Sequence, residues 1–164
     1  MKKILLRFGL PSILLLALAV VAIADSPHFQ YANTSVNSSG ALTVSFKEAG
    51  LGTGTTSVHI SLNTTASATY QCWNNGGNHP KAGNKETVVT SLVASGNFAV
   101  RNGQTTGALT VGPPSQGSFS CPSGQSLFLE QATYSGINVS DQTTNSLGAS
   151  PDPISGPVTH ILIP

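Results

Sequence analysis

The chain has 164 residues, and only seven Lys and Arg and six Asp and Glu among them, a charged fraction of 8%. This composition argues against a nucleic-acid binder, which needs a cluster of basic side chains to displace counterions from phosphates. It also argues against a disordered chain, which is usually rich in charge and poor in apolar residues.

The first 24 residues have the features of a cleavable signal peptide. Three basic residues within the first seven precede a nearly continuous apolar run from residue 13 to 23, and the segment ends in Ala22-Ile23-Ala24. Secretory signal peptides have a positive region, an apolar region and a small-residue cleavage site in this order. A membrane anchor is the alternative, but the apolar run is shorter than the ~20 residues that span a bilayer. We expect cleavage after Ala24 and release to the extracellular side.

The expected mature protein, residues 25–164, keeps four of the basic residues and all six acidic ones, so its net charge is about −2 with His neutral. A chain of roughly 140 residues is the size of one domain with a core large enough to fold unaided. We expect no nucleic-acid partner and no membrane insertion after cleavage, and the sequence makes no prediction of the oligomeric state.

Apolar and polar residues alternate along most of the mature chain, as in Leu42-Thr43-Val44-Ser45-Phe46. A period of two predicts half-buried strands, and Asn102-Gly103 has the residue types of a type I′ hairpin turn. Segments rich in Gly, Ser or Asn separate the apolar runs, among them Asn63-Thr64-Thr65. We predict about eight or nine strands, drawn from ten candidate segments near residues 28–37, 41–48, 56–63, 66–73, 86–95, 97–101, 105–112, 126–135, 136–141 and 157–163. This pattern indicates an all-β, single-domain sandwich or barrel, and we favour an immunoglobulin-like β-sandwich.

The two cysteines predict one inter-strand disulfide. Cys72 is in phase with the apolar face of its predicted strand, and Cys121 is in phase with Phe119. An isolated pair of cysteines in an exported protein most simply forms a disulfide. A redox-active or metal-binding pair is the alternative, and it lacks the C-x-x-C spacing of such sites.

Several segments resemble small secreted, β-rich proteins of actinobacterial type, a family of uncharacterised function. They are residues 42–52, reading LTVSFKEAGLG, residues 68–78, reading ATYQCWNNGGN, and the shorter matches Asn84-Lys85 and Ser120-Cys121-Pro122. The resemblance covers roughly residues 40 to 145. It implies export, a bacterial host and a β-rich fold, and it implies no activity, cofactor or catalytic residue.

Motifs for catalysis and metal binding are missing from the sequence. G-x-S-x-G does not occur, the four His are at least 20 residues apart, and the calcium pattern D-x-[DN]-x-[DN]-G is absent. Nothing in the sequence indicates a pair of carboxylates placed for glycoside hydrolysis. We therefore predict no catalytic residue, no metal site and no cofactor.

One segment, residues 73–86, is predicted to be a long loop that begins beside Cys72 and lies near the 113–124 loop with Cys121. Loops anchored on a rigid scaffold commonly carry binding groups. The residues that we predict to bind a ligand are Trp73, Asn75, Asn78, His79, Lys81 and Lys85. The alternative is a solvated connection in which Trp73 is buried beside the disulfide.

These observations favour an exported, non-enzymatic module that binds an extracellular or envelope ligand, namely a cell-surface polymer, a sugar or a protein. Two alternatives remain: a secreted hydrolase with dispersed site residues, and a secreted enzyme inhibitor. A cleft in which a base contacts a nucleophile favours the hydrolase, and a protruding loop around Cys121 favours the inhibitor.

Overall fold

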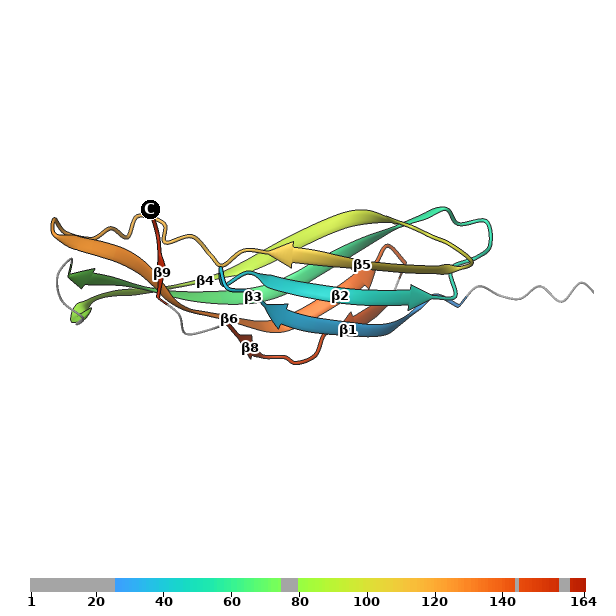
Figure 1. The fold of residues 1–164 in the computed structure, drawn as a ribbon. Coiled ribbons are helices and arrows are strands. Elements are labelled where there is room, and N and C mark those ends of the chain that lie inside the picture. The colour runs from blue at the N-terminus through green and yellow to red at the C-terminus, as the bar shows by residue number, and fades with distance from the viewer. Residues whose placement is uncertain (1–25, 75–79, 144, 157–159) are drawn as a thin grey trace, which may run out of the picture.

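The structure, a computed structural model, describes residues 26–74, 80–143, 145–156 and 160–164, with the backbone alone for residues 80–82. The predicted signal peptide lies outside these residues. The described chain forms two β-sheets of unequal length packed face to face (Figure 1). No helix of the described residues is long and apolar enough to cross a membrane.

The shorter sheet has three antiparallel strands in the order β1-β2-β5. They are β1 (His28–Val36), β2 (Leu42–Ala49) and β5 (Gln104–Val111). Their alternating sequences place apolar side chains on the face toward the other sheet, where Val44 and Phe46 of β2 are fully buried.

The longer sheet is built on three long antiparallel strands in the order β4-β3-β6. They are β3 (Ser57–Asn74), β4 (Pro80–Ala99) and β6 (Gln125–Asp141). Figure 1 shows the shorter sheet covering only part of these strands, while the rest extends past it toward the end where the C-terminus lies. We call this uncovered part of the long sheet the tip.

Three short strands pair one after another along the second edge of β6. They are β7 (Ser146–Gly148), β8 (Ile154–Ser155) and β9 (Ile161–Leu162). Ser150, between β7 and β8, donates its N–H to the carbonyl of Ala32 and accepts from the N–H of Thr34, both at 2.9 Å. The tail therefore joins the long sheet to β1 of the short sheet.

The buried apolar residues form two clusters. The larger lies between the sheets and includes Phe46, Ile60, Leu62 and Tyr134. The smaller lies under the tip, where Ala68, Tyr70 and Leu129 are covered by Phe119, Ile161 and Ile163 from outside the long strands.

The predicted Asn102-Gly103 hairpin is confirmed. Asn102 has φ 51° and Gly103 has φ 69°, and Arg101 and Gln104 exchange both backbone hydrogen bonds, at 2.8 and 3.0 Å. Two residues with positive φ are the requirement of a type I′ turn.

Several predicted strand boundaries are wrong, because three pairs of predicted strands are continuous. The predicted break at residues 63–65 lies inside β3, where the buried Thr64 donates its hydroxyl to the carbonyl of Ser135 at 3.1 Å. The predicted break after residue 135 is a β-bulge in β6, where Gly136 has φ 60°. The predicted strands at 86–95 and 97–101 are likewise parts of β4 or its hairpin.

The predicted disulfide between Cys72 and Cys121 is confirmed, but it does not join two strands. Cys72 lies in β3 and is fully buried. Cys121 lies in the connection between β5 and β6, outside any strand. The bond therefore fastens this connection, residues 112–124, to the inner face of the tip.

The close packing of β5 against β4 predicts a sharp effect at Gly107. A Cβ at this position would lie 2.3 Å from the ring of Phe98 and 3.0 Å from Phe46, two rings that pack edge to face in the core with centroids 4.9 Å apart. We expect Gly107→Ala to lower the free energy of unfolding by about 1–3 kcal/mol, the usual range for overpacking, as measured by urea denaturation.

The control is Gly112→Ala, at the exposed residue directly after β5, since no atom lies within 4 Å of a Cβ there. Equal stability losses in the two variants would contradict the packing described here.

Candidate functional site

The predicted loop at residues 73–86 is much shorter in the structure. Strand β3 continues through Asn74 and β4 begins at Pro80, and Lys85 and Glu86 pair with Gln71 and Tyr70. The prediction was wrong because a segment rich in Gly, Asn and Lys has the composition of a loop. In the structure, pairing with β3 makes residues 80–86 part of a strand.

Strand alternation sends neighbouring residues of β3 to opposite faces of the long sheet. Cys72 points inward to its disulfide and is fully buried. Trp73 is half-buried and lies on the outer face. The alternative reading of Trp73 as buried beside the disulfide is therefore wrong.

A bulge in β6 places an acidic side chain next to Trp73. Tyr70 pairs with Leu129 while Thr69 pairs with Gln131, so Glu130 is the extra residue of β6. Trp73 Nε1 donates to Oε1 of Glu130 at 2.6 Å. On the other oxygen, His160 Nδ1 donates to Oε2 at 2.8 Å. One carboxylate thus holds an indole and an imidazole side by side.

The rings of this group are in contact. The centroids of Trp73 and His160 are 4.4 Å apart with the planes tilted by 58°. Phe128 of β6 packs edge to face against Trp73 at 6.2 Å. The side chain of Glu130 is 14% exposed and that of His160 is 49% exposed, so the group opens to solvent on its His160 side. We call Trp73, Phe128, Glu130 and His160 the Trp73 cluster.

The structure brings together a different set of residues from the predicted one. Lys85 is exposed on the same outer face as Trp73, since it pairs with Gln71, two residues from Trp73. Asn75, Asn78 and His79 lie outside the described residues, as does the side chain of Lys81.

Sequence reasoning missed Phe128, Glu130 and His160. The only available signal was the alternation at the C-terminus, which places His160 out of phase with Ile161 and Ile163.

The inner face of the tip carries a row of amide side chains. Asn84 Nδ2 donates to Oε1 of Gln125 at 2.8 Å, and Gln125 Nε2 donates to Oδ1 of Asn74 at 3.1 Å. These bonds link the side chains of β4, β6 and β3 at the end of the sheet. They hold the three strands in register where the shorter sheet does not cover them.

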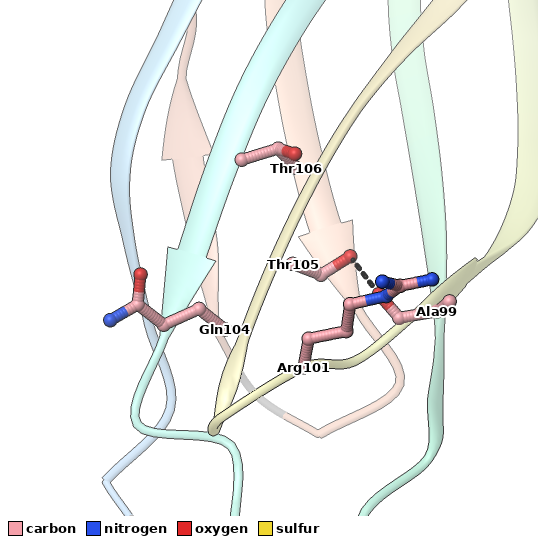
Figure 2. A pocket seen from close by; sticks show the side chains of 5 residues that line it. All are labelled: Ala99, Arg101, Gln104, Thr105 and Thr106. Atoms are coloured by element: carbon pink, nitrogen blue, oxygen red, sulfur yellow. Dashed lines mark hydrogen bonds between the residues drawn. The ribbon is translucent and has the colours of Figure 1, made fainter.

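A pocket of about 370 Å³ lies beside the Asn102-Gly103 hairpin. Its described lining residues are Ala99, Arg101, Gln104, Thr105 and Thr106 (Figure 2). The hydroxyl of Thr105 donates to the carbonyl of Ala99 at 3.0 Å. These residues offer one cationic group and neutral hydrogen-bonding groups, with no carboxylate, histidine or cysteine among them.

At the same end of the sandwich, Glu48 is completely buried. It continues the inward alternation of β2 after Phe46 and pairs with Thr105 of β5. Neither of its carboxyl oxygens accepts a hydrogen bond from a described N–H or O–H group. A buried carboxylate without donors is energetically unfavourable.

The group next to Glu48 is the carboxyl of Asp141 from the long sheet. Burial, a hydrogen bond with Asp141 and the negative charge of Asp141 together raise the pKa of Glu48 from 4.5 to about 7. Burial also acts to raise the pKa of Asp141, but hydrogen bonds from Thr143, Asn145 and Glu48 outweigh it and lower this pKa below 3.8. A hydrogen bond between the two carboxyls therefore needs a proton on Glu48, which donates to ionised Asp141.

The described residues contain no cluster of three or more His, Cys, Asp or Glu side chains that could hold a metal ion. The one acid–base side-chain contact within 4 Å among these residues is Glu130–His160, which is an ion pair when His160 is protonated.

Comparison of the chain with models of known protein families, with curated proteins and with solved structures finds no match. Its function must therefore be inferred from its own residues and their geometry.

The buried Glu48 predicts an unusual dependence of stability on pH. The folded protein keeps the proton of Glu48 up to pH about 7, whereas the unfolded chain loses it near 4.5, so stability should fall as pH rises across this interval. Asp141 acts in the opposite direction, and its contribution is lost as pH falls below 3.8. We expect the melting temperature to be highest at about pH 4 to 5, where Asp141 is ionised and Glu48 is protonated, and to decline toward pH 8.

Glu48→Gln should remove most of the decline and raise the free energy of unfolding at pH 8 by about 1–3 kcal/mol, the range for an unsatisfied buried group. Glu86→Gln, at an exposed carboxylate, is the control. A wild-type melting temperature that stays constant or rises from pH 5 to 8 would refute the assignment.

Proposed function

We propose that the chain is an exported, non-enzymatic binding module of immunoglobulin-like architecture, and that it holds a neutral polysaccharide on the outer face of its long sheet. The observation that carries this proposal is the Trp73 cluster, a group of three rings already held in place before any ligand binds. Glu130 orients both Trp73 and His160. Binding sites whose side chains are ordered in advance lose less entropy when a ligand binds.

The outer face next to the cluster has the chemistry of a surface for a neutral ligand. Between the rows of Ser61 and Thr69, the outward positions of the three long strands carry hydroxyl or amide side chains, apart from exposed Val89 and Val93. The hydroxyl and amide residues are Ser61, Asn63, Thr65, Ser67 and Thr69 of β3, Thr87, Ser91 and Ser95 of β4, and Gln131, Thr133, Ser135, Asn138 and Ser140 of β6.

None of these positions carries a charge, so these rows have no cationic side chain to attract a polyanion. Successive rows are about 7 Å apart, since a strand rises about 3.3 Å per residue. A long, flat array of hydroxyls and amides that ends at aromatic rings suits a linear chain of sugars, which forms hydrogen bonds with its hydroxyls and packs its apolar ring faces on aromatic side chains.

The strand order supports the immunoglobulin-like part of the proposal. Strands one, two and five form one sheet, and strands three, six and seven lie together in the other. Immunoglobulin domains place their A, B and E strands in one sheet and C, F and G in the other. The fourth strand departs from the constant-domain pattern, because β4 pairs with β3 rather than with β5.

Export is supported by the N-terminal pattern and by the disulfide, which persists in oxidising compartments. The inhibitor alternative receives no support from the segment around Cys121. Phe119 packs under the tip, and the buried Tyr70 hydroxyl donates to the carbonyl of Pro114. This segment therefore lies against the sheet instead of protruding.

The test uses Trp73, the single tryptophan of the chain, as a fluorescent reporter. Titration with soluble neutral oligosaccharides, combined with pull-down on insoluble neutral polysaccharides, should reveal a ligand that shifts the emission of Trp73. Trp73→Ala and His160→Ala should each weaken binding about tenfold, the effect of losing one aromatic contact. Because Trp73→Ala has no tryptophan, its binding is measured by affinity electrophoresis.

Tyr31→Ala is the control, because Tyr31 is a 38% exposed ring on β1 of the other sheet. Circular dichroism should show all variants folded. The proposal is wrong if wild type binds no neutral polysaccharide, or if Trp73→Ala and His160→Ala bind as tightly as Tyr31→Ala.

A further inference from the structure

The carboxyls of Glu48 and Asp141 lie at the hairpin end of the sandwich, opposite the Trp73 cluster, and take no part in the proposed function. Glu48 comes from β2 of the short sheet and has no exposed surface. Both of its oxygens lack a donor among the described residues. The carboxyl of Glu48 interacts with that of Asp141, and a fully buried acid beside a second acid needs a positive partner, which is either a proton or a cation.

Asp141 and the turn after β6 supply further oxygen atoms at this place. Thr143 Oγ1 lies 2.8 and 2.7 Å from the two carboxyl oxygens of Asp141. The side-chain amide of Asn145 lies 3.1 Å from Oδ2 of Asp141 and 3.0 Å from Oγ1 of Thr143. Rotation of this amide by 180° presents its oxygen in place of its nitrogen. Asp141, Thr143 and the rotated Asn145 thus present a carboxylate, a hydroxyl and an amide oxygen close together, and the carboxyl of Glu48 interacts with that of Asp141.

A proton satisfies this arrangement only in part. A protonated Glu48 donates through one oxygen to Asp141, and its other oxygen stays buried without a partner. A cation bound by both oxygens of Glu48 leaves neither without a partner. An all-oxygen set with bidentate carboxylates, a hydroxyl and an amide is the set that Ca²⁺ prefers, with water completing six to eight ligands.

We propose that Glu48, Asp141, Thr143 and Asn145 form a binding site for a divalent cation of the Ca²⁺ type. Glu48 distinguishes this site from an ordinary acidic turn. Its side chain comes from the opposite sheet, contacts Asp141 and is buried without a hydrogen-bond donor. Thr143 is exposed and Asp141 is half-buried, so the ion can enter from solvent. The bound ion would clamp the short sheet to the end of β6.

This site was missed in the sequence because only Asp141, Thr143 and Asn145 are neighbours in the chain, while Glu48 belongs to a distant strand. With two carboxylates, the expected dissociation constant is on the order of 0.1–1 mM, the range of extracellular calcium modules.

The test is calcium-dependent stability of the purified protein at pH 8 after chelator treatment. About 5 mM CaCl2 should raise the melting temperature of the wild type by about 4 °C above the value in NaCl of equal ionic strength. Isothermal titration calorimetry should show one site. Glu48→Gln and Asp141→Asn should each abolish the calcium-induced shift, and Glu86→Gln should retain it.

Glu48→Gln removes a buried charge and keeps the side-chain volume, so it should fold even if Asp141→Asn disrupts the turn. The compared quantity is the shift caused by calcium, not the melting temperature itself. The absence of a shift beyond that of NaCl, or equal shifts in Glu48→Gln and Glu86→Gln, would show that the pair binds only a proton and would overturn the proposal.

Discussion

The structure depends on covering the apolar inner face of a sheet that is about twice as long as its partner. Strand β3 has 18 residues, whereas β2 has 8, so the short sheet buries only part of that face. The remainder, around Tyr70 and Leu129, would be left in water, where exposed apolar area is unfavourable. The connection before β6 and the C-terminal segment cover it instead, and the Cys72–Cys121 bond fastens the first of them.

The same requirement builds the Trp73 cluster. Because β9 pairs with β6, the chain's last residues alternate across the edge of the long sheet. Ile161 and Ile163 pack inward under the tip, and His160 is left on the outer side against Trp73. The C-terminal segment that covers the inner face of the tip thus also places the His160 ring on the outer face. The bulge at Glu130 provides the carboxylate that joins His160 to Trp73.

The two ends of the sandwich therefore have different chemistry. At the tip, charged and aromatic side chains lie on the outside and open to solvent. At the hairpin end, Glu48 lies on the inward face of β2. The earlier residues of β2 on this face are apolar, namely Leu42, Val44 and Phe46. The burial of Glu48 could be predicted from the sequence, since the alternation that predicts a buried Phe46 also predicts a buried Glu48. The contact between the Glu48 and Asp141 side chains could not be predicted, because these residues belong to different sheets.

The sequence alone was sufficient for the strands, from the alternation of apolar and polar residues, and for the Asn102-Gly103 turn, from residue types that accept positive φ. It was also sufficient for an all-β fold with one disulfide, from the single pair of cysteines. It was misleading at residues 63–65, 80–86 and 135–136, where pairing with long neighbouring strands overrides local turn composition. The tertiary structure alone decided which side chains meet. Trp73 with Glu130 and His160, and Glu48 with Asp141, are contacts between segments distant in the chain, and the register and packing of the sheets determine them.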